Sequence, residues 1–149
     1  KYNPVIDAAS IPTGEIADVT GTPMDFTELK PMKQEIDADF DQLRYTGGYD
    51  HNYVLDWEPG KLKEAAKAYC RETGILMTVF TDLPGVQFYA GNGIDNVVGK
   101  EGLIYPRRSA FCLETQYYPN AVNTPAFPSP VLKAGETYHT TTVYKFTVE

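Results

Sequence analysis

The sequence is poor in basic clusters and has no long apolar runs. Its 13 Lys and Arg stand against 20 Asp and Glu, and the pair Arg107-Arg108 is the longest basic run. A surface that follows nucleic-acid phosphates or an anionic membrane is therefore not expected. No apolar run in the sequence is long enough to cross a bilayer. Glycine-rich phosphate loops, nucleophile elbows and HExxH motifs are also absent, which excludes the enzyme classes that those motifs mark.

Cysteine and histidine are scarce as well, with two of each. Cys70 and Cys112 form no CxxC motif and have no companion histidine pair, so no metal site is predicted. The two thiols either form a disulfide or lie free in the core, and free cysteine is usually buried. The chain starts without Met and without the apolar segment of a signal peptide. We expect a cytoplasmic protein, and a chain that is processed or part of something longer.

What the sequence contains favours a β-rich fold. Its 149 residues are a usual length for one domain, and 42% of them are hydrophobic, enough for a core. The 11 Tyr and 7 Phe favour strands, while 12 Gly and 11 Pro indicate many turns. Composition alone therefore argues against a helical bundle.

Alternation of side chains along the chain predicts the strands. The clearest lies at 136–148, where Tyr138, Tyr144, Phe146 and Val148 share one parity and are expected to face a core. Further strands are predicted at 53–57, 75–81, 86–90 and 111–116. Residues 61–71 have helix propensity, but the short turn that follows favours an antiparallel strand.

The first forty residues are punctuated by Pro4, Pro12, Pro23 and Pro31, and we expect an ordered, irregular wrap with short extended pieces. Together with the predicted strands, this gives a single all-β domain. We expect a β-sandwich of antiparallel sheets with long ordered loops.

Three polar clusters interrupt this pattern. In the first, two glycines that permit a tight turn or a close approach to a ligand precede Asp50, His51 and Asn52. These three side chains either satisfy local backbone amides in a turn or present polar groups at the mouth of a strand.

The second cluster surrounds Gln87. Strand alternation directs Gln87 away from Val86 and Phe88, and its amide suits sugar hydroxyls. Phe88 or Tyr89 could stack on the face of a sugar ring. An ordinary solvent-facing glutamine is the alternative interpretation.

The third cluster contains Glu114, which shares a strand face with Cys112 and Gln116. A carboxylate held at a partly dry position there would be a candidate general base, and Glu114 is the best one in the chain. The alternative is an exposed edge-strand glutamate. We expect His139 to be a surface side chain. The pair Arg107-Arg108 either grips an anionic group or is simply solvated.

In their order along the chain, these stretches resemble the aldose 1-epimerases, also called galactose mutarotases. The matching residues are 11–16, 21–26, Gly48-Tyr49-Asp50-His51-Asn52-Tyr53, Pro84-Gly85-Val86-Gln87-Phe88-Tyr89, Cys112-Leu113-Glu114-Thr115-Gln116 and the tail at 128–138.

The resemblance implies a galactose-mutarotase-like β-sandwich that interconverts the α and β anomers of free hexoses such as glucose and galactose. It assigns Glu114 as general base and Asp50 and Gln87 as sugar-binding residues, with His51 and Asn52 in support. Neither a metal nor an organic cofactor is implied, and the partner is a free hexose. Acid and base groups of matched pKa suffice for opening the sugar ring.

The match departs from the family in one respect. Family members are longer, and their first half carries a sugar-binding arginine and two histidines, one of them the general acid. Neither His51 nor His139 lies in the corresponding motif. Residues 1–149 are therefore expected to be the C-terminal portion of one sandwich domain. A second chain or segment, the N-terminal half, would supply the acid.

Two other functions stay open from the sequence. A carbohydrate-binding module would keep Asp50, Gln87 and the aromatic residues and bind hexose without catalysis. A glycosidase would use Asp50 and Glu114 as its pair of carboxylates, and their separation would set the stereochemical outcome.

Overall fold

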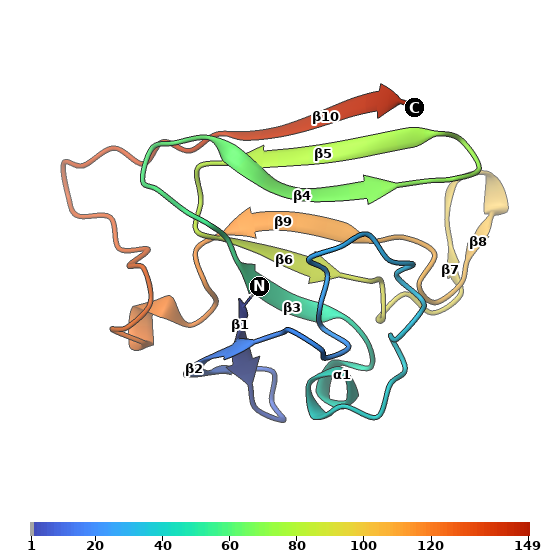
Figure 1. The fold of residues 1–149 in the computed structure, drawn as a ribbon, viewed down its shortest axis with the longest axis horizontal. Helices are drawn as coiled ribbons and strands as arrows, with labels where there is room; N and C mark the ends of the chain where they lie inside the picture. Colours follow the sequence, from blue (N-terminus) through green and yellow to red (C-terminus); the bar gives the residue numbers. More distant parts are fainter. Residues whose placement is uncertain (1) are drawn as a thin grey trace.

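Ten strands and little helix make up the chain in the computed structural model, which describes residues 2–149 (Figure 1). The strands are β1 Tyr2–Ile6, β2 Pro12–Asp18, β3 Asp50–Val54, β4 Lys63–Tyr69, β5 Ile75–Thr81, β6 Gly85–Tyr89, β7 Val97–Val98, β8 Ile104–Tyr105, β9 Cys112–Gln116 and β10 Thr142–Val148. The helical turns are α1 Asp41–Thr46 and the 3-10 helices η1 Lys100–Gly102 and η2 Ala121–Asn123.

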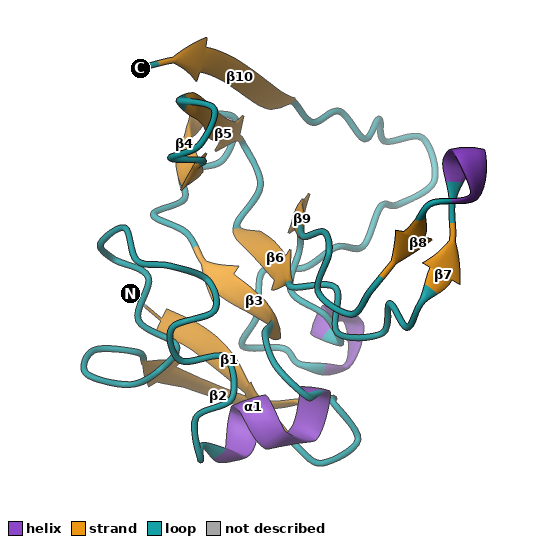
Figure 2. Ribbon diagram, turned by 90° about the vertical axis from the view of Figure 1, so that its right-hand side faces the viewer, coloured by secondary structure: helices purple, strands orange, loops and turns teal. Residues whose placement is uncertain are grey.

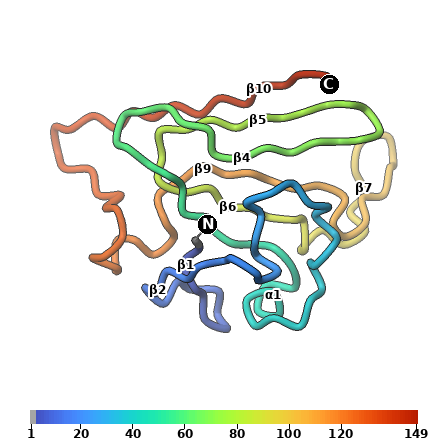
Figure 3. Tube along the Cα trace, in the orientation of Figure 1, coloured from blue at the N-terminus to red at the C-terminus, as the bar shows by residue number. Residues whose placement is uncertain are grey.

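These strands form three antiparallel sheets. The five-stranded sheet has the order β2-β1-β3-β6-β9, the three-stranded sheet β10-β5-β4, and β7 pairs with β8 in a small ribbon. In both ribbon views β10 and β5 lie at one end of the molecule and α1 lies at the opposite end (Figures 1 and 2). Long connections join the sheets, the longest after β9 running from residue 117 to residue 141, as the trace shows (Figure 3). The prediction of an all-β chain with antiparallel sheets and long ordered loops is confirmed.

Several predicted strands match the observed ones. The predictions at 75–81, 86–90 and 111–116 differ from β5, β6 and β9 by at most one residue at either end. The ambiguous segment at 61–71 contains β4, which pairs with β5 through a short turn. Helix propensity in β4 is overridden because its residues gain an antiparallel ladder with β5, which is interrupted by one shift of register between Glu64 and Ala66.

Other boundaries differ from the predictions. The strand expected at 53–57 is β3, which begins at Asp50 because Asp50 pairs with Tyr89 and Asn52 pairs with Gln87. The first polar cluster therefore lies in a strand and not in a turn. Near the start, β1 and β2 form an antiparallel pair whose register shifts once, between Pro4 and Ile6. Only the following stretch to residue 40 is the irregular wrap that was expected.

The C-terminal strand is shorter and more exposed than predicted. Its pairing with β5 runs from Thr142 opposite Thr81 to Val148 opposite Ile75, so residues 136–141 lie outside the ladder. Tyr144, Phe146 and Val148 are 46%, 64% and 78% exposed. The expectation that this face is buried in a core is wrong for the described residues, because β10 is an edge strand with nothing packed over its outer end.

The expectation of buried thiols is also wrong. Cys70 and Cys112 are both free and exposed. Cys70 follows the end of β4 at a turn, and Cys112 starts β9 on the face that carries Glu114.

The main core covers only one face of the five-stranded sheet. Phe88 of β6 packs there against side chains from the irregular wrap and α1, and stacks on Tyr49 with ring centroids 5.2 Å apart. The fully buried or nearly buried members are Val19, Met24, Ile36, Leu43, Tyr49, Phe88 and Ala90. The opposite face of the same strands is thus left for polar side chains. Among residues 2–149, no helix is long and apolar enough to cross a membrane.

Candidate functional site

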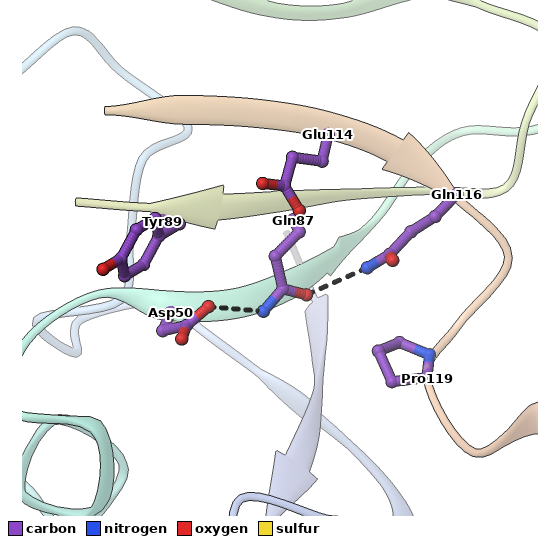
Figure 4. Close-up of a pocket in the computed structure, with 6 residues that line it drawn as sticks. All are labelled: Asp50, Gln87, Tyr89, Glu114, Gln116 and Pro119. Atoms are coloured by element: carbon purple, nitrogen blue, oxygen red, sulfur yellow. Dashed lines mark hydrogen bonds between the residues drawn. The ribbon is translucent and has the colours of Figure 1, made fainter. Parts of the chain in front are cut away.

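An open pocket of about 430 Å³ lies on the face of the five-stranded sheet opposite the core (Figure 4). It is lined by Asp50, Gln87, Tyr89, Glu114, Gln116 and Pro119. The lining residues come from three adjacent strands, β3, β6 and β9, and from the turn that follows β9. The structure thus brings Asp50, Gln87 and Glu114 together at one place.

The backbone ladder explains why these side chains meet. Gln87 is directly opposite Asn52 on one side and Glu114 on the other, so the three form one row across the sheet. Because neighbouring strands lie about 4.8 Å apart, each step along this row is short. Alternation directs Val86 and Phe88, which are 3% and 6% exposed, to the other face. The predicted orientation of Gln87 relative to Val86 and Phe88 is confirmed.

A chain of side-chain hydrogen bonds connects the pocket residues (Figure 4). The Gln87 Nε2 group donates to Asp50 Oδ1 over 2.8 Å, and the Gln87 carbonyl oxygen accepts from Gln116 Nε2 over 2.9 Å. Gln116 Nε2 also donates to Asn52 Oδ1 over 3.1 Å. These contacts fix the orientation of the Gln87 amide, since its nitrogen must face the carboxylate.

Asn52 fits beneath the pocket because Gly85 has no side chain. Asn52 is only 5% exposed. A Cβ atom added at Gly85 would lie 2.5 Å from Asn52 Oδ1 and 3.0 Å from the Tyr118 ring. The glycine opposite Gln116 in the ladder therefore leaves the space that the Asn52 amide occupies.

His51 lies on the other side of the sheet from the pocket. Its side chain is 1% exposed, and its Nδ1 atom accepts a hydrogen bond from the Asp50 backbone N–H over 3.0 Å. Burial lowers the pKa of His51 to about 4, against a smaller opposing effect of the Gln42 backbone. His51 is therefore neutral near pH 7, and it contacts Asp50 through the backbone only.

Glu114 is exposed on β9. The partly dry environment expected for it is therefore absent among the described residues, because nothing in residues 2–149 packs over this end of the pocket. Burial and the nearby carboxylates of Glu114 and Asp50 raise the pKa of the Cys112 thiol.

The sequence did not indicate Gln116 or Pro119 as parts of the pocket wall. Gln116 was placed on the correct face, but its bridging position depends on the pairing of β9 with β6. Of the two candidate stacking residues, Phe88 is in the core and Tyr89 lines the pocket, where its hydroxyl accepts a hydrogen bond from the Gly93 backbone over 2.8 Å. Tyr89 has the same parity as Gln87, so strand alternation directs both side chains to the pocket face of β6.

Carboxylates and amides around an open pocket offer acceptors and donors suited to the hydroxyls of a neutral polyol. Within residues 2–149, no group of three or more His, Cys, Asp or Glu side chains is arranged to hold a metal ion. His139 is an exposed side chain, as predicted.

Comparison with known proteins gives consistent matches over nearly the whole chain. A family model described as aldose 1-epimerase matches residues 1–145. The chain is 43% identical over 148 residues to a galactose mutarotase of Rattus norvegicus, covering 99% of this chain and 41% of the relative. It is 33% identical over 151 residues to an aldose 1-epimerase of Escherichia coli K12, covering 100% of this chain and 43% of the relative.

Solved structures share the fold. A crystal structure of an aldose epimerase homologue from C. elegans has a TM-score of 0.78 and 25% identity, with 99% of this chain and 43% of that chain covered. A galactose 1-epimerase from Lactobacillus acidophilus NCFM has a TM-score of 0.57 and 22% identity, with 99% and 41% covered. The predicted galactose-mutarotase-like fold is confirmed. The chain spans about two fifths of the length of the curated relatives it matches.

Proposed function

This chain belongs to the aldose 1-epimerase family, and from that premise we propose that it is part of an enzyme that interconverts the α and β anomers of free hexoses such as glucose and galactose. The observation that carries the proposal is that Asp50, Gln87 and Glu114 line one and the same pocket. Opening of the sugar ring requires a base and groups that bind the sugar hydroxyls, and the residues that line this pocket offer both.

In the proposed mechanism Glu114 is the general base. Its carboxylate takes the proton from the anomeric hydroxyl while an acid protonates the ring oxygen, and the bond between C1 and the ring oxygen breaks. The open-chain aldehyde then rotates about the C1–C2 bond and closes by the reverse proton transfers. No net proton or electron is consumed, and acid and base groups of matched pKa suffice for both proton transfers.

Asp50 and Gln87 hold the sugar in this mechanism. The Asp50 carboxylate accepts hydrogen bonds from sugar hydroxyls, and Gln87 offers an amide that is already oriented by Asp50 and Gln116. Asn52 supports Gln116 from below, and His51 supports the backbone of Asp50. A site oriented before the sugar arrives loses less entropy on binding it.

We propose that the general acid comes from the part of the family fold that this chain does not span, as a second chain or a preceding segment. Three observations support this arrangement. The pocket is open, Glu114 is exposed, and Phe146 and Val148 of β10 are 64% and 78% exposed. A covering segment would dry the carboxylate and bury those apolar side chains in one step. A cytoplasmic location remains a prediction from the sequence.

The direct test is polarimetry of freshly dissolved α-glucose and α-galactose, with the intact mass of every polypeptide in the sample measured first. We expect the longer protein, meaning this chain together with the proposed N-terminal half in one chain or in a complex of two, to accelerate the change in rotation over buffer. We expect residues 1–149 alone to leave the uncatalysed rate unchanged. Saturable hexose binding without acceleration by the longer protein would favour a carbohydrate-binding module. Release of a reducing end from a glycoside would favour a glycosidase.

A further inference from the structure

Two adjacent arginine side chains donate hydrogen bonds to the same backbone carbonyl just before β3. Arg107 Nη2 donates to the Gly47 oxygen over 2.6 Å, and Arg108 Nη2 donates to the same oxygen over 2.9 Å. Gly47 ends α1 and lies three residues before Asp50. The arginine pair therefore holds the corner from which the Asp50 strand begins.

Arg108 is itself held in place by Asp37. Its two terminal nitrogens donate to the two Asp37 carboxylate oxygens over 2.8 and 2.7 Å, the bidentate geometry that arginine forms with a carboxylate. The Arg108 side chain is 22% exposed. This pairing lowers the pKa of Asp37, because the guanidinium donates hydrogen bonds to its ionised form. One arginine thus joins the irregular wrap to the start of β3.

A second route runs from Arg107 through Asn92. Arg107 Nε donates to the Asn92 backbone oxygen over 3.2 Å, and Asn92 Nδ2 donates to the Tyr49 oxygen over 2.9 Å. The Tyr49 oxygen also accepts from the Ala90 backbone N–H over 2.9 Å. This route therefore ties the residue before Asp50 to the residue after Tyr89.

The corner is shaped to admit these contacts. Gly48 has a φ of +134°, and a Cβ atom there would lie 2.3 Å from Asn92 Oδ1. A Cβ atom at Gly47 would lie 2.9 Å from Arg107 Nη2. The two glycines leave space for groups that approach from residues 92 and 107, which a generic turn would not need.

We propose that Arg107 and Arg108 are positioning residues for sugar binding, acting through the Gly47–Tyr49 corner on Asp50. The inference rests on the proposed function for its kinetic consequence. Neither arginine lines the pocket. Their contacts lead to β3 and to the end of β6, whereas Glu114 lies on β9. Loss of the arginine contacts to this corner therefore weakens binding of the sugar and leaves the proton-transfer step of Glu114 largely intact.

The test compares Arg107→Gln and Arg108→Gln in the longer protein that contains this chain. We expect KM for the hexose to rise by about fivefold to tenfold in each variant, with kcat within about twofold of wild type. A second readout needs no turnover. This readout is the rate of hydrogen exchange of the Gln87 side-chain amide, measured by NMR in glutamine-labelled protein. We expect the rate to increase in both arginine variants, because the hydrogen bond from Gln87 to Asp50 weakens when Asp50 moves.

Matched variants separate this role from a general loss of stability. Arg44 pairs with Asp39 and Asp41 on the surface, and Arg44→Gln is expected to leave both readouts unchanged. Arg108→Lys keeps the charge but cannot donate two parallel hydrogen bonds to Asp37, so we expect a KM between those of the wild type and Arg108→Gln. If Arg108→Gln does not fold, Asp37→Asn removes only the ion pair and is measured in its place.

Unchanged KM and unchanged Gln87 amide exchange in both folded arginine variants would overturn the inference. Failure of the proposed function gives a different result. In that case the wild-type protein does not accelerate the change in rotation, while Gln87 amide exchange still reports whether the two arginines orient Asp50.

Discussion

The Gln87 amide nitrogen lies 2.8 Å from Asp50 Oδ1, although the two residues are not opposite each other in the sheet. Asp50 pairs with Tyr89, and Gln87 pairs with Asn52. The hydrogen bond is therefore a diagonal contact between β3 and β6, and it ties the orientation of one proposed sugar-binding group to that of the other.

Replacing Gln87 with Leu is expected to weaken hexose binding by about tenfold or more, because the Asp50 carboxylate loses a donor and Gln116 loses an acceptor. KM of the longer protein, measured by polarimetry, should rise more than kcat falls. Gln34→Leu changes the same residue type at an exposed position and should leave KM unchanged. An unaltered KM in the Gln87 variant would remove that residue from the binding site.

Glu114→Gln is expected to lower kcat by about 10²- to 10⁴-fold, since the amide cannot take the proton of the anomeric hydroxyl. Hexose affinity, measured by calorimetry, should change by less than about threefold because the volume and most contacts are kept. Glu15→Gln, at an exposed position on β2 of the same sheet, is the control. Near-normal turnover by the Glu114 variant would assign the base elsewhere.

Gly85→Ala is expected to destabilise the fold by about 1–3 kcal/mol, because its new methyl group would meet Asn52 Oδ1 and the Tyr118 ring. Denaturant unfolding measures the change. In the Asn52→Ala background the same glycine substitution should cost less, since one of the two clashing groups is gone. Equal costs in both backgrounds would mean that the Asn52 amide is not confined by Gly85.

Stability should fall in acid because of His51. Its pKa is about 4 in the folded chain, below its ordinary value of 6.5, so the unfolded chain binds more protons between these values. The contribution of His51 to the free energy of unfolding is complete above pH 6.5 and is lost as the pH falls towards 4. The total loss is about 3 kcal/mol. Unfolding free energies of wild type and His51→Gln, compared between pH 7 and pH 4.5, measure it.

For the histidine experiment the exposed His139 provides the reference. His139→Gln should retain the wild-type dependence on pH, whereas His51→Gln should flatten it even though the buried amide lowers stability at neutral pH. The same slope in all three proteins would contradict a neutral, buried His51.

Local periodicity was enough to predict much of the site. Gln87 and Glu114 lie in strands whose alternation of side chains is complete within five residues, so the face of each could be inferred from the sequence. Asp50 and Asn52 were harder, because residues of this type after two glycines look like a turn. They are extended only through pairing with β6, and such pairing is not encoded locally.

The errors at the C-terminal strand and at Glu114 have a common cause. Alternation along β10 correctly separates an apolar side from a polar one, but it does not say which segment packs on the apolar side. In the same way, a carboxylate on a strand is dry only when another part of the chain covers it. Both properties depend on tertiary contacts over Phe146, Val148 and Glu114 that residues 2–149 do not supply.

The row formed by Asn52, Gln87 and Glu114 has a consequence for how such a site can change over time. Its spacing is set by backbone hydrogen bonds, which every residue except proline can make. Substitutions at Gln87 can therefore alter which hydroxyl pattern is preferred without moving the neighbouring strand that carries the proposed base. On the proposed function, the sugar preference could therefore change by single substitutions at Gln87 while the proposed base stays on β9.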